Sequence, residues 1–69
     1  MKISARNILQ GTVKEIILGA INAEVIIDVK GIEIAAQISV ASIKNLGLAV
    51  GKPAYAVIKT DSVLVGVDE

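Results

Sequence analysis

The chain contains no cysteine and no histidine. Without cysteine it can form neither a disulfide nor a thiolate metal site. Without histidine it lacks the commonest metal ligand and the usual imidazole base. We therefore expect no catalytic residues and no metal site built from side chains. Because small scaffolds are usually reinforced by disulfides, metals or oligomerisation, oligomerisation is the option that remains.

Aromatic residues and net charge are also scarce. Tyr55 is the single aromatic residue, and seven basic residues balance seven acidic ones. Nucleic-acid-binding domains normally carry a basic surface, and those that bind single strands stack bases on aromatic rings. No glycine-rich phosphate motif occurs either. We therefore expect no nucleic-acid partner, although an OB-like nucleic-acid-binding domain remains an alternative.

Long apolar runs are missing as well. No uncharged run approaches the ~18 residues of a membrane span. The N-terminus carries one lysine followed by polar Ser4, Arg6 and Asn7, which is not the pattern of a secretory signal. These features predict a cytoplasmic protein without a membrane partner.

Aliphatic residues make up most of what is present. The chain has 69 residues, and 54% of them are hydrophobic. This length predicts a single domain over residues 1–69, with too little interior to bury so many aliphatic side chains. Because large exposed apolar patches usually mark an interface, the excess predicts a homo-oligomer.

The first half of the chain is typical of β-structure. The β-branched segments 12–18, 23–29 and 32–38 each have the length and pattern of a strand. Residues 19–22 and the pair Lys30-Gly31 read as turns between them. A meander of three antiparallel strands is therefore predicted.

The pattern then changes to that of a short helix over residues 39–48, with Ser39 as its N-cap and Gly47 at its C-terminal end. Two further strands are predicted at 54–59 and 63–67. Five short strands with a helix between the third and the fourth match an all-β fold with one short helix. We expect an OB-like five-stranded Greek-key barrel.

Hydrogen-bond donors gather at the ends of the expected elements. They are Ser4, Arg6, Ser39, Ser42, Lys59 and Thr60. Donors without nearby carboxylates indicate a receptor for an anion. The first turn of the expected helix also lacks an acidic residue, which leaves its positive end open to an outside anion. Each residue alone still has an ordinary explanation as a cap, a surface hydroxyl or a solvated charge.

Four blocks of sequence, in this order, resemble the molbindins, also called Mop or molybdenum-pterin-binding proteins. The blocks are ISARN at 3–7, GTVKEIILGAINAEV at 11–25, SVASIKNLGLAVG at 39–51 and AVIKTDSVLVGV at 56–67. The resemblance implies an OB-like fold, dimers that exchange strands, and a hexamer built from these dimers. It also implies that molybdate or tungstate binds between subunits, with no organic cofactor.

The resemblance assigns roles residue by residue. Ser4 and Arg6 take the places of the family's N-terminal anion ligands. Ser39 and Ser42 match its hydroxyl pair at the helix start, and Lys59 and Thr60 match its lysine-hydroxyl pair. The spacing of hydroxyl residues after the lysine departs from the family's. A second anion site is implied at the first turn, formed by Gly19, Ala20, Ile21 and Asn22.

The resulting hypothesis is an intracellular protein that binds and stores molybdate or tungstate at the subunit interfaces of a homo-oligomer. The main alternative is a structural oligomerisation module that holds no oxyanion. A bound pterin is not expected, because the chain has no group of aromatic rings to stack on it.

Overall fold

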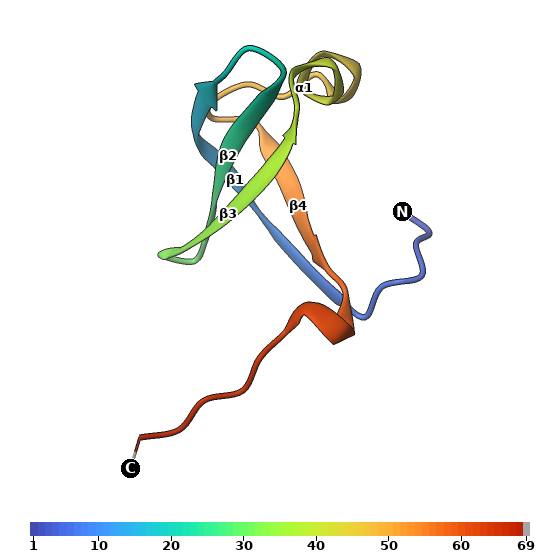
Figure 1. The fold of residues 1–69 in the computed structure, drawn as a ribbon, viewed down its shortest axis with the longest axis vertical. Helices are drawn as coiled ribbons and strands as arrows, with labels where there is room; N and C mark the ends of the chain where they lie inside the picture. The colour runs from blue at the N-terminus through green and yellow to red at the C-terminus, as the bar shows by residue number, and fades with distance from the viewer. Residues whose placement is uncertain (69) are drawn as a thin grey trace.

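The computed structural model describes residues 1–68 and contains one antiparallel sheet and one α-helix (Figure 1). The elements are β1 (Asn7–Leu18), β2 (Asn22–Val29), β3 (Ile32–Ser39), α1 (Val40–Leu46), β4 (Pro53–Ile58) and the 3₁₀ turn η1 (Thr60–Ser62). The strands lie in the order β3-β2-β1-β4. The predicted meander, helix and fourth strand are therefore confirmed. Within residues 1–68, no helix is long and apolar enough to cross a membrane.

The strand β1 is shared between two partners. Its second half pairs with β2 from Thr12↔Asp28 to Leu18↔Ala23, and its first half pairs with β4 from Asn7↔Ile58 to Thr12↔Pro53. The register with β2 shifts between Val13 and Glu15, which marks a β-bulge. Because a bulge bends a strand and increases its twist, the sheet curls, and the two pairs diverge in Figure 1.

The structure extends β1 by five residues before the predicted start at Thr12. The apolar pair Ile8-Leu9 and the glycine at 11 break the strict alternation that marks a strand. Glycine is needed at position 11 because β1 passes close to β2 there. A Cβ atom on Gly11 would lie 2.3 Å from the Asp28 carbonyl oxygen and 2.9 Å from Ile27 Cγ2. A residue that weakens the strand pattern in the sequence thus permits the close approach of two strands.

The turns follow the sequence closely. Lys30 and Gly31 both have positive φ, at 51° and 89°, as a two-residue hairpin turn requires. Ser39 is the N-cap of α1, and Gly47 ends the helix with a left-handed φ of 64°. The expected helix at 39–48 is therefore confirmed with its caps, although the regular helix covers only Val40–Leu46.

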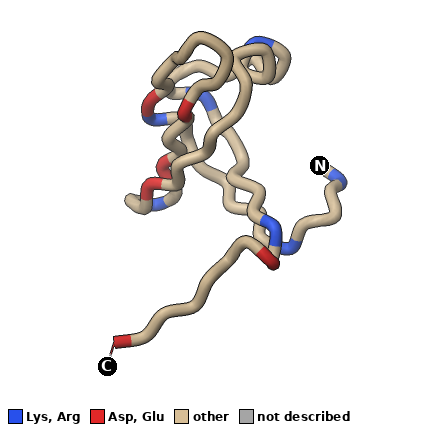
Figure 2. Tube along the Cα trace, in the orientation of Figure 1, with Lys and Arg blue, Asp and Glu red and all other residues tan. Residues whose placement is uncertain are grey.

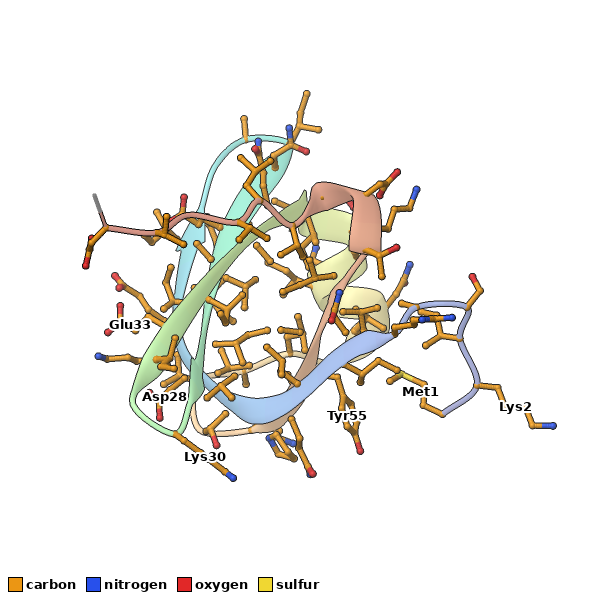
Figure 3. All side chains as sticks on the ribbon, turned by 90° about the horizontal axis from the view of Figure 1, so that it is seen from below. Met1, Lys2, Asp28, Lys30, Glu33 and Tyr55 are labelled. Atoms are coloured by element: carbon orange, nitrogen blue, oxygen red, sulfur yellow. The ribbon has the colours of Figure 1, made fainter. Side chains whose placement is uncertain are left out.

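The core lies inside the curled sheet and is closed at one end by α1. Its buried members are Val13, Ala23, Val25, Ile27, Ile43 and Ala56. Alternate residues of β2 and β4 point inward, and Ile43 contributes from the helix. Figure 3 shows aliphatic side chains filling the interior, while Tyr55, Asp28 and Lys30 lie on the outside.

The fifth expected strand is not formed in this chain. Residues 63–67 belong to no sheet of the described chain, and they run away from the domain (Figure 1). Leu64, Val65 and Val67 are 93%, 91% and 87% exposed. The β-branched pattern correctly indicates an extended segment, but a strand needs a neighbour, and the domain's own sheet is not beside it. The four-stranded sheet therefore keeps β3 and β4 as its edges, and strand exchange with another subunit stays a prediction.

The close approach at Gly11 leads to a prediction about stability. We expect Gly11→Ala to lower the melting temperature, because the added methyl group must displace the backbone of β2. Overpacking of this kind typically costs about 1–3 kcal/mol. Thermal unfolding followed by circular dichroism at fixed protein concentration measures the effect. An unchanged melting temperature would contradict the strand spacing seen here.

Candidate functional site

The register of β1 with β4 brings two polar segments together. Asn7 pairs with Ile58, so the next residues outward on the two chains are Arg6 and Lys59. After Lys59 the chain turns tightly, because Ser62 N–H donates to the Lys59 carbonyl at 3.0 Å. The N-terminal segment and η1 therefore lie against each other at the end of the β1–β4 pair.

A hollow of about 630 Å³ lies between these segments. It is lined by Ile3, Ser4, Ala5, Arg6, Val57, Lys59, Thr60 and Asp61. Four of the six expected anion ligands thus meet in one place, although they come from opposite ends of the sequence. On the same measure one water molecule needs only about 10–15 Å³, so one small oxyanion cannot touch all the walls of this hollow.

The cations of this hollow have no carboxylate partner. In residues 1–68 the sole ion pair joins Lys14 to Glu33 on the outer face of the sheet, far along β1 from the hollow. There the Glu33 carboxylate raises the pKa of Lys14. Neither Arg6 nor Lys59 takes part in any ion pair or side-chain hydrogen bond of the described chain. Two positive charges that share a hollow without a paired carboxylate can both donate to an anion.

The other two expected ligands, Ser39 and Ser42, form a separate pair at the start of α1. Their Oγ atoms lie 2.8 Å apart, and Ser39 Oγ accepts from Ser42 N–H at 3.1 Å. One hydroxyl proton is used between the two side chains, which leaves one for an outside acceptor. Neither residue lines the hollow, and in Figure 1 α1 lies at the top, whereas η1 lies beyond the lower end of β4.

The helix start is less open than the sequence indicates. The N–H of Val40 donates to the Ile21 carbonyl at 2.8 Å, and that of Ser42 is bonded to its cap. The expectation of an unoccupied first turn is therefore wrong for these two groups. The first turn does lack an acidic residue, as expected. The hydroxyl pair is one of the groups that this end of the helix still offers.

The expected second anion site, Gly19–Asn22, forms the turn between β1 and β2. Gly19 N–H donates to the Asn22 carbonyl at 2.9 Å, so this backbone donor is occupied. The shallow hollow beside the turn is lined by Glu24 and by no lysine or arginine. The turn therefore offers fewer free donors and positive charges to an anion than the hollow at η1 does. The second site stays a prediction.

The rest of the surface carries no concentrated charge. Figure 2 shows basic and acidic positions interspersed along the described chain. Such a surface lacks the electrostatic footprint of a nucleic-acid-binding domain. The chemistry that stands out is thus a locally cationic hollow with hydroxyl donors.

Comparison with known proteins agrees with the fold and the motifs. Residues 3–65 match the TOBE domain family. The chain is 52% identical over 69 residues to a probable molybdenum-pterin-binding protein of Haemophilus influenzae, covering 99% of this chain and all of that one. It superposes on a molybdate-binding protein of Sporomusa ovata with a TM-score of 0.91 at 40% identity, over 97% of this chain and all of the other.

The chain belongs to the molbindin family. A further member of known structure, the cytoplasmic molybdate-binding protein ModG with molybdate bound, matches with a TM-score of 0.93 and 46% identity. That match covers 99% of this chain and 49% of ModG, so this chain spans about half of ModG's length. The predicted family resemblance is confirmed.

Sequence reasoning missed four residues of the hollow in this molbindin: Ile3, Ala5, Val57 and Asp61. The first three are apolar and give no chemical signal in the sequence. Asp61 could have been found, because it directly follows Lys59 and Thr60. It is the one carboxylate among the residues that line this hollow.

The hydroxyl pair at α1 leads to a prediction. Ser39→Ala removes the acceptor of the Ser42 N–H and should cost about 1 kcal/mol of stability, as the loss of an N-cap usually does. Ser42→Ala keeps that N–H and should cost less. Urea unfolding of both variants at equal protein concentration compares the two. Equal losses would show that the cap bond contributes nothing beyond the contact between the two hydroxyls.

Proposed function

We propose that this chain binds molybdate, or the chemically similar tungstate, as a tetrahedral dianion. The observation that carries the proposal is the meeting of Ser4, Arg6, Lys59 and Thr60 in one hollow without an ion pair of their own. The names of its relatives as molybdate-binding proteins support the choice of ligand. The alternative of a nucleic-acid-binding domain finds no support in the dispersed charges.

Each ligand has a role that follows from its chemistry. Molybdate at neutral pH is an acceptor of hydrogen bonds and has no proton to donate. Arg6 and Lys59 supply charge-assisted bonds, which are stronger than those of neutral donors. Ser4 and Thr60 supply hydroxyl donors, and the Ser39–Ser42 pair supplies one more.

We propose that the complete site lies between subunits. Within one chain the helix start and the hollow lie apart, so a second copy must bring its Ser39 and Ser42 to the hollow. An oxyanion between two chains would also stabilise the oligomer by mass action. A cleft between subunits would exclude water, and lower dielectric strengthens each hydrogen bond.

The segment 63–67 supports assembly by strand exchange. Its apolar side chains are almost fully exposed, which is unfavourable for an isolated chain in water. One edge of the β1 segment from Asn7 to Gly11 pairs with β4, and no strand lies along its other edge in the described chain. A strand from a second copy could pair there and complete a five-stranded barrel. Dimers built in this way, and a hexamer of three dimers, are what we propose.

Selectivity would come from donor geometry rather than from charge alone. A dense cationic cluster would attract any anion, including phosphate. Donors held at a set radius leave one bond unmade around a smaller ion such as sulfate, and an unpaired buried donor costs about 1–3 kcal/mol. The physiological role that fits a small binding protein without catalytic groups is storage and homeostasis of the oxyanion in the cytoplasm.

Titration calorimetry with molybdate, tungstate, sulfate and phosphate tests the function directly. We expect heat of binding with molybdate and tungstate and a much weaker response to sulfate and phosphate. No binding of either metal oxyanion would leave the structural oligomerisation module as the better reading.

Arg6→Ala should lose most of the affinity for molybdate, because it removes one of the two cations of the hollow, yet should stay oligomeric. Lys52→Ala is the matched control, since this exposed lysine lies outside the hollow. Calorimetry and light scattering on both variants measure affinity and mass. Normal binding by Arg6→Ala would refute the assignment of the N-terminal motif.

The exposed tail gives a separate prediction about assembly. Leu64→Asp should reduce the molar mass in solution, because a charge cannot be buried against a second subunit. The side chain is 93% exposed, so the substitution removes no packing from the domain itself. Ile32→Asp changes an exposed apolar residue at the β2–β3 hairpin and should keep the mass. Size exclusion with light scattering decides, and an unaltered mass for Leu64→Asp would contradict the tail as an interface.

A further inference from the structure

Asp61 is a negatively charged residue in a hollow that we propose to bind an anion. It lines this hollow together with Arg6, Lys59 and Thr60, and its side chain is exposed. A carboxylate at neutral pH can only accept hydrogen bonds, and so can a tetrahedral dianion. Asp61 therefore cannot bind the proposed ligand, and the two negative charges repel each other.

The position of Asp61 is set by the backbone. It is the central residue of η1, whose turn is closed by the bond from Ser62 N–H to the Lys59 carbonyl at 3.0 Å and the longer bond from Val63 N–H to the Thr60 carbonyl at 3.4 Å. This turn directly follows the end of β4, which pairs with β1. Asp61 can therefore leave the hollow by rotating its side chain but not by moving its backbone, unless the turn opens.

Asp61 is not neutralised by the cations beside it. In residues 1–68 its carboxylate makes no ion pair within 4.0 Å and no hydrogen bond. The charged side chains of the hollow are then two positive and one negative, and they sum to +1. Without Asp61 the same hollow would carry +2, and its attraction for a dianion would be correspondingly stronger.

We propose that Asp61 is an affinity-limiting residue of the oxyanion site: its carboxylate repels the bound dianion, which weakens binding and speeds release. This inference rests on the proposed function of the hollow. It gives a storage protein a site that selects by geometry while keeping the ligand exchangeable. Lys59 and Thr60 supply donors to the anion, and Asp61, the next residue in the chain, offsets part of the attraction between the anion and these donors.

The test compares Asp61→Asn with the wild type by calorimetry and stopped-flow release of molybdate at low ionic strength. Asparagine has nearly the same shape and no charge. If the two ligand charges lie about 8 Å from this exposed carboxylate, we expect a gain in affinity on the order of 5- to 30-fold. The gain should appear as slower release and should shrink at high salt, where the charges are screened.

Two control variants separate charge from shape. Asp61→Glu keeps the charge and should not bind more tightly than the wild type. Glu15→Gln removes one negative charge from a residue of β1 that does not line the hollow and should leave the affinity unchanged. Tighter binding by Glu15→Gln to the same degree would assign the effect to overall charge and overturn the proposal.

Perrhenate, a tetrahedral monoanion, provides a probe of the charge itself. Because Coulomb repulsion is proportional to the charge of the ligand, the gain for perrhenate should be about the square root of the gain for molybdate. Equal gains for both anions would indicate a reshaped hollow and would count against the role given to Asp61.

The outcomes for Asp61 and for the function of the hollow are distinct. Binding by the wild type together with unchanged or weaker binding by Asp61→Asn overturns the role of Asp61 and leaves the proposed function intact. Absence of oxyanion binding in both proteins overturns the proposed function, and the role of Asp61 with it. If Asp61→Asn binds the oxyanion more tightly and releases it more slowly, and the control variants do not, the result supports both the proposed function and the role of Asp61.

Discussion

The pairing of the first half of β1 with β4 is the interaction on which the site depends. It exists because Gly11 lets β1 pass close to the Asp28 carbonyl, and because the bulge after Val13 turns the two halves of β1 toward different partners. The register that begins at Asn7↔Ile58 then places the N-terminal motif beside Lys59. Residues more than fifty positions apart thus become neighbours through backbone hydrogen bonds, before any ligand contributes.

The same geometry leaves the chain incomplete. The curled sheet encloses a small core, but the segment 63–67 lies outside it with its aliphatic side chains in water. The hydroxyl pair at α1 also lies apart from the hollow that holds the other donors. In an oligomer, a partner subunit could cover the exposed tail and also bring its helix start to the hollow. Burial of the tail and binding of the anion would then both stabilise the same assembly.

Much of this architecture was predictable from the sequence, because it is encoded locally. The Lys30-Gly31 turn, the Ser39 cap and the Gly47 end of α1 each depend on one or two residues, and all are found as predicted. The start of β1 was missed, since the reason for Gly11 is a contact with β2. The fifth strand expected at 63–67 is not formed in the described chain, because a strand needs a neighbour and a strand pattern does not say which molecule supplies it. Four of the six expected anion-binding residues line one hollow, together with Asp61, which is not among the residues expected from the sequence.

The negative charge of Asp61 bears on how a chain without net charge can recognise a dianion. Charge attracts every anion at once, so a site that depends on charge gains affinity without gaining selectivity. Hydroxyl donors act only at short range and in set directions, and they distinguish ions by radius and by the absence of a proton. A hollow with two cations, one carboxylate and two hydroxyls depends less on attraction and more on donor geometry. The zero net charge of the chain and the mixed charge of the hollow both keep the general attraction for anions low. Where sulfate and phosphate compete, the choice of anion must then come from the geometry of the donors.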